Sequence, residues 1–178
     1  MPAPRRPLPP LNSADLERYA LRYVERYATT RAKLAAYLSR KLRERGWAEE
    51  NLPDVEALAE RMAGLGYVND RLYAESKAGA MARRGLGARR VREALRFAGV
   101  EAGDAEALAP AIEADERASA LAFARRKRIG PYAREIADRP LQQKQMASMI
   151  RAGHAPAMAR AIVNMAPGDD PEATLDSG

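Results

Sequence analysis

Glycines and arginines crowd the segment 83–100, which reads RRGLGARRVREALRFAGV. Closely spaced glycines can expose backbone N–H groups that cradle the phosphates of a nucleotide. A P-loop also needs Lys-Ser or Lys-Thr after its second glycine, whereas alanine and arginine follow Gly87. A dinucleotide-binding turn needs a preceding strand and a third glycine, and position 90 is arginine. The residues therefore favour a junction between two helices. Gly85 ends the first helix, and Gly87 allows the chain to enter the second.

Other side chains that could perform catalysis are sparse. The sequence has no cysteine, and His154 is its single histidine. This excludes thiol catalysis and disulfides, and one histidine is a poor basis for a metal site or a nucleophile relay. We expect His154 on the surface or between helices. The prediction is a chain that is not an enzyme, with no catalytic residue, no metal site and no cofactor.

The charge balance points to a polyanionic partner. The chain has 30 Lys and Arg against 24 Asp and Glu, a formal net charge of +6. Such an excess favours nucleic acid, an acidic protein surface or anionic lipid, although a solvated charged surface is the simpler alternative. No apolar run approaches membrane length, so we expect no membrane partner. The absence of cysteine suits the reducing cytosol, so the prediction is a cytoplasmic protein.

Twelve basic side chains are candidate binding residues. Arg89, Arg92 and Arg96 follow one flank of an expected helix at i, i+3 and i+7, where guanidinium groups can bind phosphate or carboxylate. The run 125–128 ends another helix, where the helix dipole also favours cations without any ligand. The candidates are Arg31, Lys33, Arg40, Lys41, Arg84, Arg89, Arg90, Arg92, Arg96, Arg125, Arg126 and Lys127.

Tyrosines recur on the first expected helix. Tyr19, Tyr23 and Tyr27 stand at i, i+4 and i+8. Stacked bases could use such a strip, but helical spacing is more typical of core packing, shared with Leu16 and Val24. The prediction for this strip is therefore core packing.

The elements that must position these residues are helices, because apolar residues recur with a period near 3.6 and not with the strand period of two. Pro53 is placed in the first turn of the third helix, and Pro110 is expected to limit a short helix that follows Asp104. The expected helices cover about 13–28, 30–46, 53–66, 70–85, 88–99, a short stretch after 104, 112–128, 139–153 and a last segment that includes 158–163.

Three helix-stopping glycines reveal an internal repeat. Gly46, Gly99 and Gly153 follow one another at separations of 53 and 54 residues. Nearly equal spacing of equivalent stops predicts an all-α fold of three tandem three-helix, helix-turn-helix-like repeats, which build an elongated surface. The predicted divisions are a disordered proline-rich head 1–12, repeats at 13–66, 67–109 and 110–166, and a disordered acidic tail 167–178.

Two motifs resemble those of the RecX family, the regulators of the RecA recombinase. The segment 66–74, GYVNDRLYA, is similar to the family's Gly-Tyr-hydrophobic-Asn/Asp-Asp-x-x-aromatic-Ala segment, and 84–91, RGLGARRV, is similar to its Arg-Gly-x-Gly-x-x-Arg-hydrophobic signature. The resemblance covers about residues 15–165 and is strongest in the middle repeat. It implies a curved rod of tandem repeats that binds along the RecA–single-stranded-DNA filament, suppresses recombinase and coprotease activity, and performs no catalysis.

The resulting hypothesis is a non-enzymatic negative regulator of RecA. It would bind the filament and modulate its ATPase, strand-exchange and coprotease activities in DNA repair and the SOS response, and it would act as a monomer. One alternative is a stand-alone helix-turn-helix-like DNA-binding protein, marked by tight duplex binding without RecA. A second is a scaffold for another acidic protein.

Overall fold

The computed structural model describes residues 9–176 of the 178-residue chain. Over this range the backbone forms eleven α-helices and one 3-10 turn, and the only extended pairing is an isolated bridge between Leu11 and Trp47. The all-α prediction is confirmed, while the division into three repeats and their elongated, curved arrangement stay predictions. The described residues separate into two compact units, one of residues 9–73 with 98–100 and one of residues 74–97 with 101–176.

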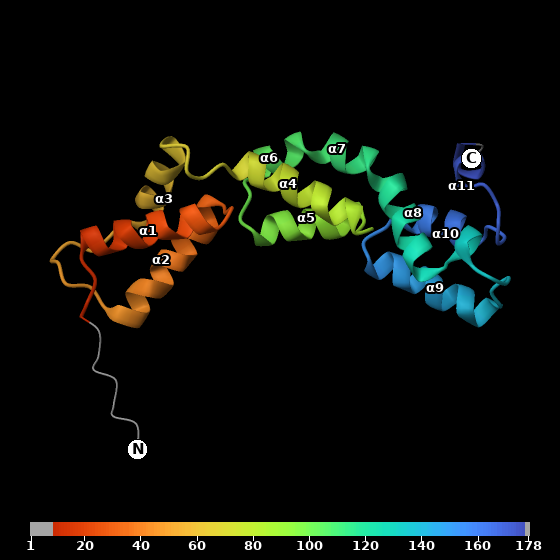
Figure 1. Ribbon diagram of the computed structural model, residues 1–178, viewed down its shortest axis with the longest axis horizontal. Coiled ribbons are helices and arrows are strands. Elements are labelled where there is room, and N and C mark those ends of the chain that lie inside the picture. Colours follow the sequence, from red (N-terminus) through yellow and green to blue (C-terminus); the bar gives the residue numbers. More distant parts are fainter. Residues whose placement is uncertain (1–8, 177–178) are drawn as a thin grey trace, which may run out of the picture. The chain divides into compact units, whose positions relative to one another are not determined.

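The first unit is built from α1 (Ser13–Arg26), α2 (Arg31–Arg45) and α3 (Val55–Gly64), which pack against one another (Figure 1). Their apolar faces form one core, as the helical period predicts. The most deeply buried side chains of that core are Leu11, Leu16, Ala20, Leu34, Leu38, Ala59 and Met62.

Short polar side chains begin the helices of the first unit. Asn12 and Asp15 form a capping box at the start of α1, and Thr30 accepts the backbone N–H of Lys33 at the start of α2. Both follow the predicted starts. The position of Pro53 was predicted wrongly, because Asp54 caps α3 by accepting the N–H of Ala57 at 2.8 Å. The proline therefore precedes the cap and is not in the first turn.

The end of the predicted disordered head belongs to the core. Leu11 is 1% exposed. Its N–H donates to the carbonyl of Gly46 at 3.0 Å, and its carbonyl accepts from the N–H of Ala48 at 2.9 Å. These contacts depend on residues far along the chain, so the local composition did not indicate them. The rest of the predicted head, residues 1–8, lies outside the described residues.

The second unit contains the greater part of α4 (Asp70–Arg83), followed by α5 (Ala88–Phe97), α6 (Ala102–Ala107), α7 (Ala109–Ala114) and α8 (Glu116–Lys127). A 3-10 turn at Gly130–Tyr132 leads to α9 (Arg139–Arg151), α10 (Pro156–Val163) and α11 (Pro171–Asp176). A second core forms between α8, α9 and α10, which lie beside one another in Figure 1. Its most buried members are Ala120, Ala124, Ile129, Met149, Ala159 and Ile162.

Three predictions for this unit differ from the structure. The expected helix 112–128 is interrupted at Asp115, where α7 ends and α8 begins. Pro110 lies in the first turn of α7 and does not end α6, because a residue without an N–H fits a turn whose N–H groups have no helical partner. In the tail, α11 replaces the expected disorder over 171–176, and Arg117 forms an ion pair with Glu172 at 2.8 Å.

The repeated glycines behave as predicted at the helix ends. Gly46 follows α2, Gly99 follows α5 and Gly153 follows α9, and their φ angles are +81°, +72° and +98°. Gly85, which follows α4, has a φ of +72°. Left-handed backbone of this kind carries little cost only for glycine, which is why helices commonly stop at this residue.

Candidate polyanion-binding surfaces

The start of α5 is joined directly to the end of α9. The N–H of Gly87 donates to the carbonyl of Ala152 at 2.9 Å, and the N–H of Arg89 donates to the carbonyl of Gly153 at 3.2 Å. Free N–H groups at one helix start thus meet free carbonyls at another helix end. A side chain on Gly87 would overlap the backbone of Gly153. Gly87 is therefore required for close approach between segments, a role that its neighbours in sequence did not reveal.

Two of the candidate arginines strengthen this joint. Arg89 donates to the carboxylate of Glu93 at 2.7 Å and to the carbonyl of Ile150 at 2.8 Å. Arg90 donates to the carbonyl of Arg151 at 3.0 Å and to Glu93 at 3.3 Å. Cations beside the carbonyls of a helix C-terminus are favoured by the helix dipole. These two guanidinium groups are thus already engaged, although both side chains remain about half exposed, at 53% and 52%.

The rest of the predicted α5 flank is more open. Arg92 forms an exposed ion pair with Glu113 at 3.0 Å, and exposed pairs of this kind contribute little stability. Arg96 is exposed and has no hydrogen bond or ion pair within the described part of the chain. Phe97 beside it is 93% exposed. Arg96 is the flank residue best able to take an external anion.

The end of α8 lies against the turn between α4 and α5. Arg126 donates to the carbonyl of Arg84, and its guanidinium lies 5.5 Å from the centre of the Phe123 ring. Arg125 lies 5.0 Å from the centre of the Tyr132 ring. Lys127 and the side chain of Arg84 are exposed. The structure thus brings Arg84 together with the 125–127 run, two candidate groups that are far apart in the sequence.

His154 supports the same turn from inside the unit. Its side chain is 3% exposed, its Nε2 lies 3.1 Å from the carbonyl of Gly85, and its ring meets Phe123 edge-on at 5.5 Å. The expectation of an inter-helix histidine is confirmed. Burial lowers the pKa of His154, against a smaller opposing effect of the Gly85 hydrogen bond. A lowered pKa favours the neutral ring. Because the Gly85 carbonyl can only accept, the neutral ring carries its proton on Nε2 and donates it there.

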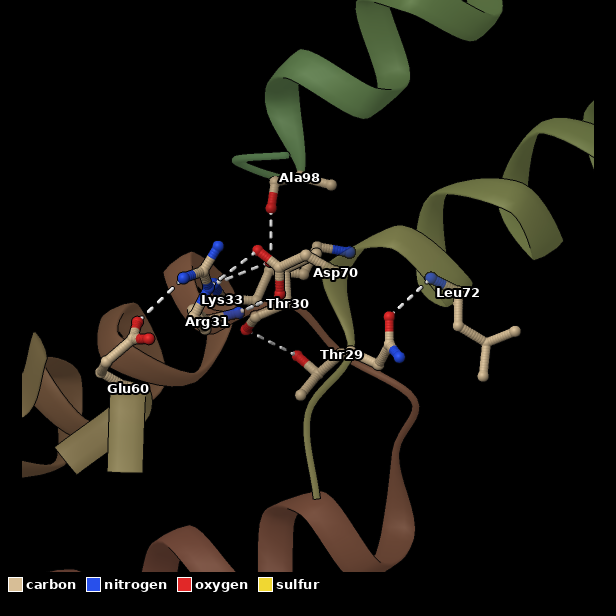
Figure 2. A network of polar contacts seen from close by, with 9 residues as sticks. Thr29, Thr30, Arg31, Lys33, Glu60, Asp70, Leu72 and Ala98 are labelled. Atoms are coloured by element: carbon tan, nitrogen blue, oxygen red, sulfur yellow. Dashed lines mark hydrogen bonds and ion pairs between the residues drawn. The ribbon is translucent and has the colours of Figure 1, made fainter. Parts of the chain in front are cut away.

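At the start of α2, Arg31 and Lys33 form polar contacts within the first unit, and those of Arg31 with Glu60 and Asp70 can be followed in Figure 2. Arg31 donates its backbone N–H to buried Asp70 at 2.9 Å, and its guanidinium reaches Glu60 at 2.9 Å. Lys33 donates to the hydroxyl of Tyr73 at 2.5 Å. These two candidates therefore hold the first unit together.

Figure 2 also shows Ala98, which belongs to the first unit, beside Thr30 at the start of α2. The hydroxyl of Thr30 donates to the carbonyl of Ala98 at 2.5 Å. A side chain on Gly99 would overlap the methyl group of Ala32. The Thr30 hydroxyl thus donates to a carbonyl just after a helix, as the N–H of Gly87 does to the carbonyl of Ala152 after α9.

The last two candidates, Arg40 and Lys41, lie at an open groove between α1 and α2. Glu44 pairs with Lys41 at 2.7 Å and lies 3.6 Å from Arg40. Basic and aromatic side chains line this groove, and several of them were not among the candidates. The lining consists of Tyr19, Arg22, Tyr23, Arg26, Tyr27, Tyr37, Arg40 and Lys41.

The tyrosine strip is divided between core and surface. Tyr19 and Tyr23 pack partly against the first core, as predicted, whereas Tyr27 is 50% exposed. Tyr37 joins the strip from α2 and stacks on Tyr23 with ring centres 4.3 Å apart. The sequence signal that could have located the groove is the spacing of Arg22 and Arg26 with the tyrosines on one helix.

Metal-binding clusters and membrane-spanning helices are both absent from residues 9–176. Among residues 9–176, no group of three or more histidine or acidic side chains is arranged to hold a metal ion. Nor does that range contain a helix with the length and apolar character needed to cross a membrane.

Comparison with known proteins gives a consistent picture. No protein-family model matches the chain. The chain is 33% identical to "Regulatory protein RecX" of Myxococcus xanthus (strain DK1622) over 175 residues, which cover 92% of this chain and 91% of that protein. Identity of this level across nearly the whole of both proteins establishes common family membership.

Solved structures agree in fold. The crystal structure of RecX from Lactobacillus salivarius matches 84% of this chain and 93% of its own, with a TM-score of 0.63 and 21% identity. A second structure, "Crystal structure of regulatory protein RecX", matches 84% of this chain and 72% of its own, with a TM-score of 0.58 and 24% identity. The sequence relationship and the shared helical fold together show that the chain belongs to the RecX family of regulatory proteins.

Proposed function

We propose that this protein is a negative regulator of the RecA recombinase, which binds the RecA–single-stranded-DNA filament as a monomer. It modulates the filament's ATPase, strand-exchange and coprotease activities by binding and not by catalysis, in the regulation of DNA repair and the SOS response. The observation that carries this proposal is the 33% identity to a RecX protein over 92% of the chain.

The distribution of positive charge supports a filament contact in the second unit. Arg84, Arg96 and Lys127 are exposed candidates whose side chains have no ion pair among the described residues. Arg92, Arg125 and Arg126 are further exposed cations of the same unit. A RecA filament offers both protein carboxylates and DNA phosphates, and a guanidinium group can bind either one with two parallel hydrogen bonds.

The direct test is the ATPase activity of RecA on single-stranded DNA at physiological salt. The protein is titrated well below one copy per RecA. Inhibition at such ratios supports action on the filament, because simple competition for DNA needs enough protein to cover the lattice. Tight binding to duplex DNA without RecA, with inhibition only at lattice saturation, would instead favour a stand-alone DNA-binding protein.

A charge-matched pair of variants tests the surface. Arg84→Gln with Arg96→Gln removes two exposed charges from the proposed face, and we expect the concentration for half inhibition to rise about tenfold. Arg134→Gln with Arg160→Gln removes two exposed charges elsewhere in the same unit and should leave inhibition within about twofold of the parent chain. Equal effects of both pairs would show that net charge matters and that this surface does not.

A further inference from the structure

The groove between α1 and α2 has an unusual composition for a protein surface. Four tyrosines and four cations line it, and none of its lining residues is acidic. Tyr19, Tyr23 and Tyr37 rest on the apolar core of the first unit, so their inner faces are fixed. Tyr27 extends the row and is half exposed.

The rings form a continuous aromatic row. Tyr23 stacks on Tyr37 with centres 4.3 Å apart and planes 21° apart, and it meets Tyr27 at 5.3 Å. Tyr19 and Tyr37 meet edge to face, with ring centres 6.5 Å apart. Arg45 donates to the hydroxyl of Tyr19 at 3.2 Å. The row is thus held in place before any ligand arrives, which reduces the entropy that binding must overcome.

Cations surround this row. Arg26 lies 5.6 Å from the centre of the Tyr27 ring, and Arg40 lies 5.5 Å from that of Tyr37. Lys41 lies within 6.0 Å of two rings and donates to Glu44, a hydrogen bond that raises the pKa of Lys41 and keeps it charged. Arg22 is exposed and has no ion pair within residues 9–176. Glu44 therefore offsets only part of the charge.

We propose that this groove, formed by Tyr19, Tyr23, Tyr27 and Tyr37 with Arg22, Arg26, Arg40 and Lys41, binds single-stranded nucleic acid by base stacking. The exposed face of Tyr27 takes a base, and the arginines take the flanking phosphates. An acidic peptide could use the cations, but it offers no flat rings for the tyrosine row. A duplex keeps its bases stacked internally, so the single strand is the ligand that matches both features. In the RecA filament this groove would hold the single strand, a role that rests on the proposed function.

The experiment uses the full-length chain and no RecA. Fluorescence anisotropy follows a 5′-fluorescein-labelled oligothymidylate of 12 nucleotides as protein is added at several salt concentrations. Stacking of one base on an aromatic side chain corresponds to a loss of about tenfold in affinity when the ring is removed. We expect that loss for Tyr27→Ala and for Tyr27→Leu, and near-parental affinity for Tyr27→Phe, which keeps the ring.

Matched controls come from the same unit. Tyr67 is 52% exposed and lies outside the groove. Tyr67→Ala should therefore leave the affinity for the oligonucleotide within about twofold of that of the parent chain. Arg22→Gln should reduce the slope of log affinity against log salt by about 0.7, the value for one phosphate contact on a single strand. Arg18→Gln, on the same helix but outside the groove, should leave that slope unchanged. Far-UV circular dichroism confirms that each variant is folded.

Three outcomes would overturn the inference. The first is absence of oligonucleotide binding at about 50 mM salt, where phosphate contacts are strong. The second is an equal loss for Tyr27→Ala and Tyr67→Ala. The third is displacement of the oligonucleotide by polyglutamate added at the same concentration of negative charge, which would identify a site for acidic protein. RecA inhibition without oligonucleotide binding would overturn this inference alone, whereas groove-dependent binding without RecA inhibition would overturn the proposed function alone.

Discussion

Replacing Gly87 by alanine tests how α5 and α9 are joined. The new methyl group would overlap the backbone of Gly153 and His154, and these atoms cannot rotate away. Either the overlap is kept, at a typical overpacking cost of about 1–3 kcal/mol, or the segments separate. Separation loses the hydrogen bonds from Gly87 to Ala152 at 2.9 Å and from Arg89 to Gly153 at 3.2 Å, together about 1–3 kcal/mol. Both routes predict destabilisation by about 1–3 kcal/mol.

Gly103→Ala is the matched control. Gly103 lies within α6 in the same unit, and a methyl group there meets no atom within 4 Å. Alanine is the better helix former, so this variant should be more stable than the parent by up to about 1 kcal/mol. Neither glycine has the left-handed backbone that a side chain would strain. The two substitutions are therefore chemically identical, and they are expected to change the free energy of unfolding in opposite directions.

Urea denaturation followed by far-UV circular dichroism measures both variants. The urea concentration at the unfolding midpoint should fall for Gly87→Ala and should stay or rise for Gly103→Ala. The dependence of the unfolding free energy on urea concentration should be unchanged in both variants. A Gly87→Ala midpoint equal to that of Gly103→Ala would refute the reasoning, because it would show that the start of α5 and the end of α9 are not in contact.

Further predictions concern buried polar groups. Since burial lowers the pKa of His154 from 6.5, the unfolded chain takes up a proton first as pH falls below 6.5, and stability should drop by at most about 1.4 kcal/mol per pH unit down to the lowered pKa. Thermal melts at pH 5 and 7.5 should show this dependence in the parent and less of it in His154→Phe. Asp70→Ala should cost about 1–3 kcal/mol, because the partly buried N–H of Arg31 loses its acceptor. Glu60→Ala removes an exposed partner of the same arginine and should cost less than about 1 kcal/mol in urea titrations.

The helix pattern could be predicted because its determinants are local. Asn12 and Thr30 cap helices through residues three positions away, and the glycines that stop α2, α5 and α9 adopt positive φ. Prolines were less informative, because the same residue fits both before a helix and in its first turn. Pro53 and Pro110 were misplaced by that ambiguity.

The motif 66–74 allowed the family to be recognised, and the structure shows that its residues hold the fold. Val68 and Ala74 are buried, Asp70 accepts the N–H of Arg31, and Tyr73 accepts from Lys33. Buried contacts of this kind restrict the residue type at each position. The motif therefore identified the architecture and did not reveal which exposed residues bind a partner.

The sequence by itself indicated most of the helices and their glycine stops, the excess of positive charge and the membership of the family. Only the tertiary structure decided what each cation contacts. Arg31 meets Asp70 across 39 residues of sequence, and Arg89 meets the carbonyl of Ile150 across 61. It likewise decided that Tyr37 joins the row on α1 to form a groove. Capping and helical period act within a turn or two of chain, whereas these partners meet only when helices distant in sequence pack together.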